Sequence, residues 1–125
     1  MEPNSSLQVA TVLLGIGAAG GLVMAGIRLK GADRPPSWLA MLHGVLAAAA
    51  LTLLAYAAYT VGIPPLAKYA LAVLIVAAVG GAAINLMYHA KMLPLPIPMV
   101  IGHALIAAVG FVLLLICVMG LGRPG

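Results

Sequence analysis

The hydrophobic residues of this chain gather into four long runs, separated by short polar or proline-rich segments. A transmembrane helix needs about 20 mostly apolar residues to cross about 30 Å of hydrocarbon, and each run is long enough. The pattern predicts helices over residues 7–29, 38–63, 67–89 and 99–121. Because the connections are short, neighbouring helices are expected to be antiparallel. We therefore predict an all-α membrane protein, a four-helix bundle in which residues 1–125 form a single membrane domain.

The composition supports a membrane protein. Of the 125 residues, 65% are hydrophobic and only 6% are charged, which is too apolar for one water-soluble domain of this size. A net charge of +4 would suggest a nucleic-acid partner in a soluble protein. Here the basic residues lie at the ends of the apolar runs, so we interpret them as topology signals and expect no nucleic-acid partner. Cys117 is the single cysteine, which excludes an intramolecular disulfide.

The basic residues also predict an orientation. Four of them lie on the side of the bundle that carries the first and third loops, Arg28, Lys30, Arg34 and Lys91, and two lie on the other side, Lys68 and Arg123. Loops that remain in the cytoplasm are enriched in lysine and arginine. We therefore expect a multi-pass protein of a bacterial-type inner (plasma) membrane, with loops 30–37 and 90–98 cytoplasmic and both termini outside.

An internal repeat relates the two halves of the chain. An offset of 60 residues without gaps aligns identical residues at many positions, among them Gly20 with Gly80, Gly21 with Gly81, Pro36 with Pro96, His43 with His103, and Pro64 with Pro124. The histidine match carries the most weight, because histidine is rare in this chain. We predict two tandem copies of a two-helix unit, residues 7–65 and 67–125. Both copies would enter the membrane in the same direction, as parallel repeats around a pseudo-twofold axis along the membrane normal.

The repeat places two histidines at equivalent depths, a short distance inside the second and fourth helices. At helical spacing from His43 and His103 the residues are mostly small, which is typical of helix contact faces in membranes. Both imidazoles are therefore expected to point into the bundle, where a polar group needs a partner. Small residues at Gly17 and Gly21, and at the equivalent Ala77 and Gly81, would also allow close helix approach, either inside the bundle or against another protein.

One candidate partner is a haem, because two inward histidines at one depth can supply both axial ligands of a b-type iron. Basic residues on the same membrane side could meet the haem propionates: Arg28, Arg34 and Lys91. The architecture and the two histidines resemble the small four-helix b-type cytochrome modules of respiratory membranes. The resemblance implies electron transfer or help in placing a quinone, and it extends to no family-specific motif.

Two other interpretations stay open. The histidines could instead be polar core residues that hydrogen-bond each other, a backbone carbonyl, or the pair Asn85 and His89, which sit four apart on the third helix and are candidates for a second layer around a haem. Alternatively, methionines on the same membrane side could join the histidines in a copper site: Met24, Met41, Met87, Met92 and Met99. A transport function is not favoured, since no carboxylate lies inside a predicted span.

The sequence contains none of the nucleophile, phosphate-loop or metal-helix motifs that mark common enzymes. We therefore expect a non-catalytic subunit of a larger membrane complex of the respiratory or photosynthetic electron-transfer type, with haem b between His43 and His103 and quinone as a further candidate partner. The alternatives are a haem-free structural or assembly protein, and a small copper-binding or transport protein.

Overall fold

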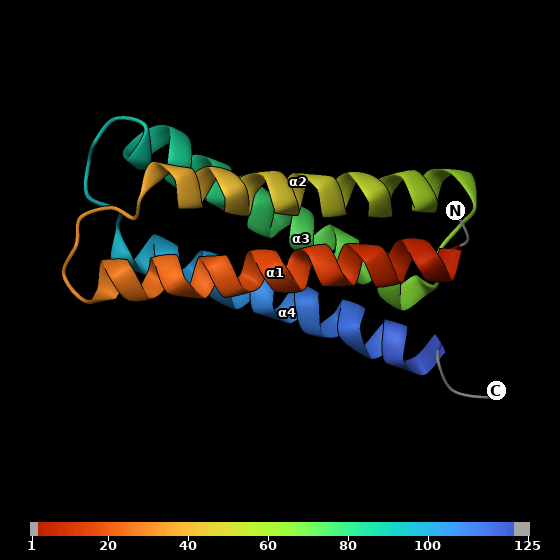
Figure 1. Cartoon of the computed structure of the whole chain (residues 1–125). Coiled ribbons are helices and arrows are strands. Elements are labelled where there is room, and N and C mark those ends of the chain that lie inside the picture. The colour runs from red at the N-terminus through yellow and green to blue at the C-terminus, as the bar shows by residue number, and fades with distance from the viewer. Residues whose placement is uncertain (1–2, 122–125) are drawn as a thin grey trace.

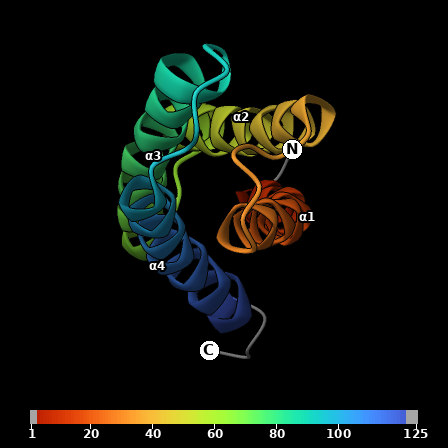
Figure 2. The ribbon, with the colours of Figure 1, turned by 90° about the vertical axis from the view of Figure 1, so that its left-hand side faces the viewer.

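The computed structural model describes residues 3–121, which form a bundle of four long helices (Figures 1 and 2). The helices are α1 (Pro3–Leu29), α2 (Ser37–Thr60), α3 (Pro65–Ile84), which continues into the π-helical turn η1 (Asn85–His89), and α4 (Ile97–Leu121). Each of the four spans, α3 together with η1, is long and apolar enough to cross a membrane. The predicted all-α bundle of four membrane helices is confirmed at this level.

Glycine and proline mark several helix ends. Helix α1 begins at Pro3, four residues before the predicted start, and ends at Leu29 as predicted. Gly31 and Gly62 follow α1 and α2 with φ of 115° and 82°, a left-handed conformation that glycine adopts without steric cost and that ends a helix. Helix α2 therefore stops at Thr60 and does not continue to residue 63. Helix α4 begins before residue 99, since Pro98 is tolerated in a first helical turn.

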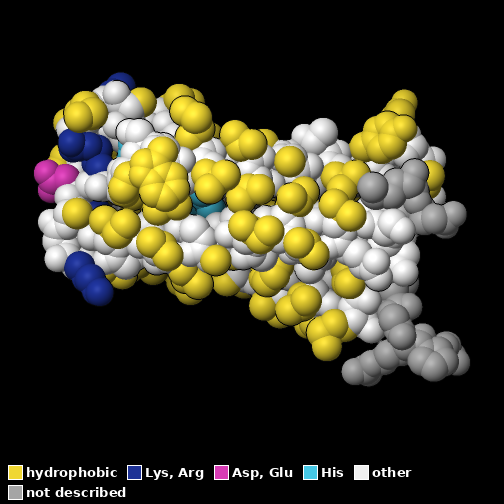
Figure 3. Space-filling model, in the orientation of Figure 1, with side chains coloured by type: hydrophobic (Ala, Val, Ile, Leu, Met, Phe, Trp, Pro, Cys, Tyr) yellow, Lys and Arg dark blue, Asp and Glu magenta, His cyan; other side chains and the backbone are white. Residues whose placement is uncertain are grey.

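The outer faces of the helices are apolar, as lipid contact requires. Large hydrophobic side chains on every helix are exposed, for example Leu22, Val45, Val79 and Leu105. Figure 3 shows hydrophobic side chains along the helices, whereas the lysine, arginine and aspartate side chains visible on this face gather at one end. This end carries the loops 30–36 and 90–96, and we call it the charged end. The structure is compatible with a multi-pass membrane protein, while the type of membrane and the orientation stay predictions.

The helices are packed unevenly, both around the bundle and along its long axis. Helix α1 packs mainly on α2 and α3 mainly on α4, whereas α2 and α3 touch each other least among the neighbouring pairs. The fully packed core occupies the half away from the charged end. It is built from Leu7, Ala10, Leu14, Ala50, Leu54, Ala57, Ile63, Ala67, Ala70, Leu74, Leu114 and Cys117. The half nearer the charged end contains a cavity, described below.

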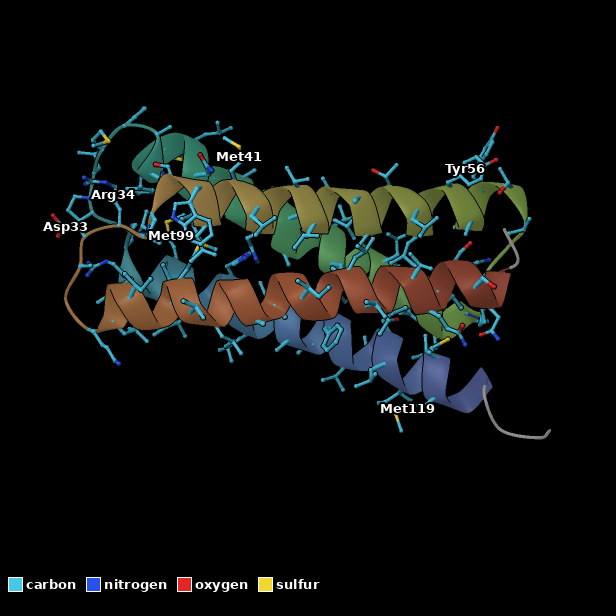
Figure 4. All side chains as sticks on the ribbon, viewed as in Figure 1. Asp33, Arg34, Met41, Tyr56, Met99 and Met119 are labelled. Atoms are coloured by element: carbon cyan, nitrogen blue, oxygen red, sulfur yellow. The ribbon has the colours of Figure 1, made fainter. Side chains whose placement is uncertain are left out.

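Four hydrogen bonds connect the loops and helix ends at the charged end, and we call them the loop clasp. They run from Arg28 Nε to the Leu95 carbonyl (2.8 Å), from the Leu95 amide to the Asp33 carbonyl (3.0 Å), from Arg34 Nη1 to the Met92 carbonyl (2.7 Å), and from His89 Nε2 to the Pro35 carbonyl (3.0 Å). Figure 4 shows Asp33 and Arg34 at this end of the molecule. The clasp therefore ties the two loops and the ends of α1 and η1 together across the charged end.

Candidate functional site

The two histidines that the sequence singles out lie close together between α2 and α4. Their ring centroids are 6.2 Å apart, and the ring planes make an angle of 80°. The Nδ1 atom of His43 lies 2.7 Å from the carbonyl oxygen of Gly17 in α1, and Nδ1 of His103 lies 2.7 Å from the carbonyl oxygen of Ala77 in α3. Each histidine therefore fastens its own helix to the helix that precedes it in the chain.

A glycine on the neighbouring helix makes room for each imidazole. A methyl group placed on Gly21 would lie 3.0 Å from Cε1 of His43, and one placed on Gly81 would lie 2.9 Å from Cε1 of His103. Both distances are shorter than side chains normally tolerate, so an alanine at either position would displace the ring. The small-residue pattern of the sequence thus serves internal packing around the histidines.

The hydrogen bonds define which ring nitrogen of each histidine is free. A carbonyl oxygen can only accept a hydrogen bond, so Nδ1 must carry the hydrogen in both rings. In the neutral imidazole, Nε2 then keeps its lone pair. A histidine that ligates a metal through one nitrogen commonly donates its other N–H to a backbone carbonyl, which fixes the ring orientation and raises ligand basicity. Both His43 and His103 meet this description.

The two rings line one cavity of about 360 Å³, within the usual size range of small-molecule sites. Most of the lining is apolar and made of small residues from α2 and α3, including Gly44, Ala47, Ala48, Ala78 and Ala82. Helix α4 contributes only Val100 and His103. The cavity therefore lies off the centre of the bundle, toward the side where α2 and α3 touch least.

The polar end of the cavity lies next to the loop clasp. Arg28, Asn85 and His89 all line the cavity. His89 donates its Nε2 hydrogen to the Pro35 carbonyl, which leaves Nδ1 of the neutral ring as an acceptor. Asn85 and His89 bound the π-helical turn η1, whose wider turn is closed by a 2.8 Å bond from the Ala90 amide to the Asn85 carbonyl. π-Helical turns of this kind occur frequently at functional sites.

The other two basic residues proposed for the site are not brought to the cavity. The guanidinium of Arg34 bonds the Met92 carbonyl, and Lys91 is exposed on the loop; neither is among the residues that line the cavity. Of the three basic residues that the sequence predicts for the site, Arg28 is therefore the one that lines the cavity. The sequence did not predict that Pro35 and Leu95 would line the cavity. Both residues are buried and form its wall at the charged end. Nothing in their side chains signals this role.

The methionines do not assemble around the histidines. Met24 lines the cavity, whereas Met41, Met87 and Met92 are exposed, and Figure 4 shows Met41 pointing away from the bundle. Met99 is half-buried and is not among the residues that line the cavity. Among the described residues, no group of three or more histidine, cysteine, aspartate or glutamate side chains could hold a metal ion. A copper site built from several thioethers and imidazoles is therefore not favoured by this arrangement.

Comparisons with protein-family models, with curated proteins and with solved structures find no match for this chain.

Proposed function

We propose that this chain is a small, non-catalytic membrane subunit that binds one b-type haem between His43 and His103 and belongs to a larger electron-transfer complex. The observation that carries the proposal is the pair of free Nε2 atoms on two rings that line one cavity with their centroids 6.2 Å apart. Haem bound here would supply one-electron transfer. The residues of the chain would bind it, orient it and keep water from it.

The ring separation is compatible with both histidines holding one iron. Bonds between imidazole nitrogens and protein metals are about 2.0–2.1 Å long, and a nitrogen lies roughly 1 Å from its ring centroid. If both Nε2 atoms bound one metal, the ring centroids would therefore lie up to about 6.3 Å apart. The separation of 6.2 Å between His43 and His103 is compatible with this value, and it is also within the range of an edge-to-face contact between two rings.

The surroundings of the rings also suit a flat macrocycle with two carboxylates. Small side chains beside the histidines leave room for an apolar ring, while Arg28 and Asn85 supply hydrogen-bond donors at the polar end. The second nitrogen of each axial histidine already donates to a helix carbonyl, as is usual for metal-ligating histidines. In this proposal Arg28 and Asn85 bind the propionates and His89 holds the Pro35 carbonyl beside them, while Arg34 and Lys91 lie farther out at the membrane face.

We further propose that the chain is a tandem repeat of one two-helix unit, with a pseudo-twofold axis along the membrane normal. The hydrogen bond from His43 to Gly17 has a counterpart 60 residues later, from His103 to Ala77. Residues 51–60 and 111–120 also follow the same order of buried, half-buried and exposed positions. Such symmetry supports one ligand shared between the two units.

Membership of a larger complex is supported by the short connections between the helices, which leave no extramembrane domain for catalysis or signalling within residues 3–121. An electron-transfer subunit needs a donor and an acceptor, and another membrane protein or a lipid-soluble quinone would supply them. Gently solubilised native membranes test this part on a native gel. Migration as a free 12.6 kDa monomer would contradict it.

The haem is tested by spectroscopy on the purified protein after expression with added haem. We expect a Soret band with the sharp α and β bands of a six-coordinate, low-spin iron. In His43→Ala or His103→Ala these low-spin bands should be lost, and they should return when free imidazole is added, because the small molecule can occupy the vacated ligand position. Met41→Ala, an exposed change on the same helix as His43, is the matched control and should keep the wild-type spectrum.

A second candidate function is favoured by the same hydrogen bonds. In a haem-free structural subunit, the histidines would act only as connections between helices, and the described residues hold no buried side-chain nitrogen or oxygen without a hydrogen-bond partner. This function predicts a colourless protein even after haem loading. It also predicts that His43→Ala and His103→Ala lower the thermal stability by the loss of one interhelical hydrogen bond each, about 1 kcal/mol.

A further inference from the structure

The cavity that holds the two histidines is closed at the charged end. Pro35 and Leu95 are buried residues of its wall, and their backbone groups take part in the loop clasp. Arg28 adds a second hydrogen bond to the loop, from Nη1 to the Ala32 carbonyl at 3.3 Å. A ligand that came from the aqueous phase would have to break several of these bonds to reach the histidines.

The opposite end of the cavity is closed by the hydrophobic core. Leu54 and Leu114 are completely buried, and they lie on α2 and α4 on the side of the histidines away from the charged end. Such packing leaves no passage along the bundle axis without displacing large core side chains, which is costly in close-packed interiors.

On the side between α1 and α4, the residues that line the cavity are half-buried and none is exposed: Gly21, Met24, Ala25 and Arg28 on α1, and Val100 and His103 on α4. Farther from the charged end, an aromatic ring packs between the same two helices. Phe111 of α4 reaches the backbone of Gly15 in α1, where its Cζ lies 3.7 Å from the position that a methyl group on the glycine would take. At an offset of sixty residues, Leu51 takes the place of Phe111 in the first half, and Ile75 takes the place of Gly15 in the second half. The two flanks of the bundle are therefore built differently, although the histidines are equivalent.

The side between α2 and α3 is open. Four residues line the cavity there and are at the same time exposed: Gly44 and Ala48 on α2, and Ala82 and Asn85 on α3 and η1. We call them the lateral opening. Except for Asn85, whose amide lies nearest the charged end, their side chains are a hydrogen atom or a methyl group. Figure 2 shows the charged end, with the ribbons of α2 and α3 neighbouring each other around the bundle.

We infer that the ligand of this cavity enters from the bilayer, through the lateral opening between α2 and α3. The inference rests on the proposed haem function, and it adds the class of ligand: a flat, lipid-dissolved molecule whose polar edge stays near Arg28 and Asn85. Because the surface around the opening is apolar, such a ligand need not cross water between the membrane and the histidines. In this proposal Ala48 and Ala82, which we call the gate residues, set the width of the opening, and their methyl groups make no polar contact with the ligand.

The test measures the rate of haem transfer from donor vesicles to the haem-free protein reconstituted in acceptor vesicles, followed by the growth of the Soret band. The double variant Ala48→Phe/Ala82→Phe narrows the opening. It should slow uptake by about tenfold or more, because entry must wait for the helices to separate. Because Ala48 and Ala82 also line the cavity, the final spectrum and the equilibrium haem affinity are measured beside the rate, and slowed uptake that still reaches the low-spin spectrum supports the inference. Ala48→Leu/Ala82→Leu is the smaller change and is the variant to compare if phenylalanine prevents folding or fills the haem site.

Matched controls carry the same change on exposed alanines that lie outside the cavity lining. Ala49→Phe on α2 and Ala72→Phe on α3 should take up haem at the wild-type rate. Wild-type uptake rates in both gate variants would overturn the inference and leave the proposed haem site intact. Faster uptake in Arg34→Ala, which loosens the loop clasp, would overturn it as well, because entry would then pass through the loops. Failure of the wild-type protein to bind haem would overturn both proposals.

Discussion

The imidazole of His43 lies 6.2 Å from that of His103, centroid to centroid, and each ring is held by a hydrogen bond from Nδ1 to a carbonyl of a neighbouring helix. Rings held in this way would lose little freedom when they bind a ligand, which would favour the proposed ligation by both histidines. The weak point of this arrangement is the contact between each ring and a glycine.

Alanine at Gly21 or Gly81 should weaken axial ligation. The added methyl group would lie 3.0 Å from Cε1 of His43 or 2.9 Å from Cε1 of His103, so each ring must move to avoid it. We expect a fall in haem affinity and a shift from low-spin toward high-spin iron, measured by haem titration and absorption spectra.

The preceding glycines supply the controls for this prediction. A methyl group on Gly20 or Gly80 meets no atom closer than 3.8 Å or 4.0 Å, respectively, so alanine fits there. Gly20→Ala and Gly80→Ala should keep the wild-type spectrum and affinity. Equal losses in all four variants would instead mean that any added methyl group on this face disturbs the bundle, and that the ring contacts are not decisive.

The histidine pair could be predicted from the sequence because it depends on periodicity. The predicted 60-residue repeat and the periodicity of a helix together predict equivalent heights and inward faces for His43 and His103, and the structure has their ring centroids 6.2 Å apart. The acceptors, in contrast, are the carbonyls of Gly17 and Ala77, and every residue has a carbonyl. Which carbonyl faces a given ring depends on the rotation and distance of two packed helices, which the sequence does not specify.

Removal of the positive charge of Arg28 should lower the midpoint potential of a bound haem. Arg28 lines the cavity, and a nearby cation stabilises the reduced, less positive iron centre. We expect Arg28→Gln to shift the midpoint to more negative values in a redox titration and to weaken haem binding. Arg34→Gln removes the same charge from outside the cavity lining and should shift the midpoint less. Equal shifts would argue against a propionate contact at Arg28.

Sequence reasoning grouped Arg28 with Arg34 and Lys91, since all three lie on one membrane side. The structure separates them by their backbone contacts. Arg34 extends to the Met92 carbonyl of the other loop, and Lys91 stays exposed. A long basic side chain near a helix end has many carbonyls within reach, so its partner is decided by the loop conformation. Composition and charge pattern carry no information on that conformation.

Alanine at Gly110 should destabilise the packing of α4 on α3, because Gly110 lies directly against Leu74. A methyl group on Gly110 would lie 2.7 Å from Cγ of Leu74 and 3.3 Å from its backbone nitrogen, so the helices would have to separate. Overpacking of this kind costs about 1–3 kcal/mol. Gly110→Ala should lower the midpoint of unfolding in detergent, followed by circular dichroism. Gly102→Ala, with nothing within 4 Å of the added methyl group, is the control and should be neutral or slightly stabilising.

Met92 should be replaceable by glycine with a gain in stability. Its φ of 59° lies in the left-handed region, which costs a residue with a side chain about 1–2 kcal/mol. Met92→Gly removes this cost and adds some entropy to the unfolded chain, so we expect a net gain of up to about 1 kcal/mol. Met87→Gly, inside η1, should have the opposite sign, because glycine weakens a helical turn. A loss of stability in both variants would contradict the strain at Met92.

The orientation of the bundle is testable by cysteine labelling with all charges kept. In a Cys117→Ala background, Ala90→Cys places a thiol at the charged end and Val61→Cys places one at the connection between α2 and α3; both positions are exposed. The excess of basic residues at the charged end predicts that this end is cytoplasmic. In intact cells a membrane-impermeant maleimide should therefore label the residue-61 variant, and it should label the residue-90 variant only after permeabilisation.

The labelling result also decides on which side of the membrane the haem would lie. The cavity and its polar end, with Arg28 and His89, belong to the same half of the bundle as Ala90. Labelling of the residue-90 variant in intact cells would show the opposite topology, with the propionate end of the cavity facing the outside. Electron transfer would then connect with partners on that face, so the donor and acceptor should be sought according to the labelled end.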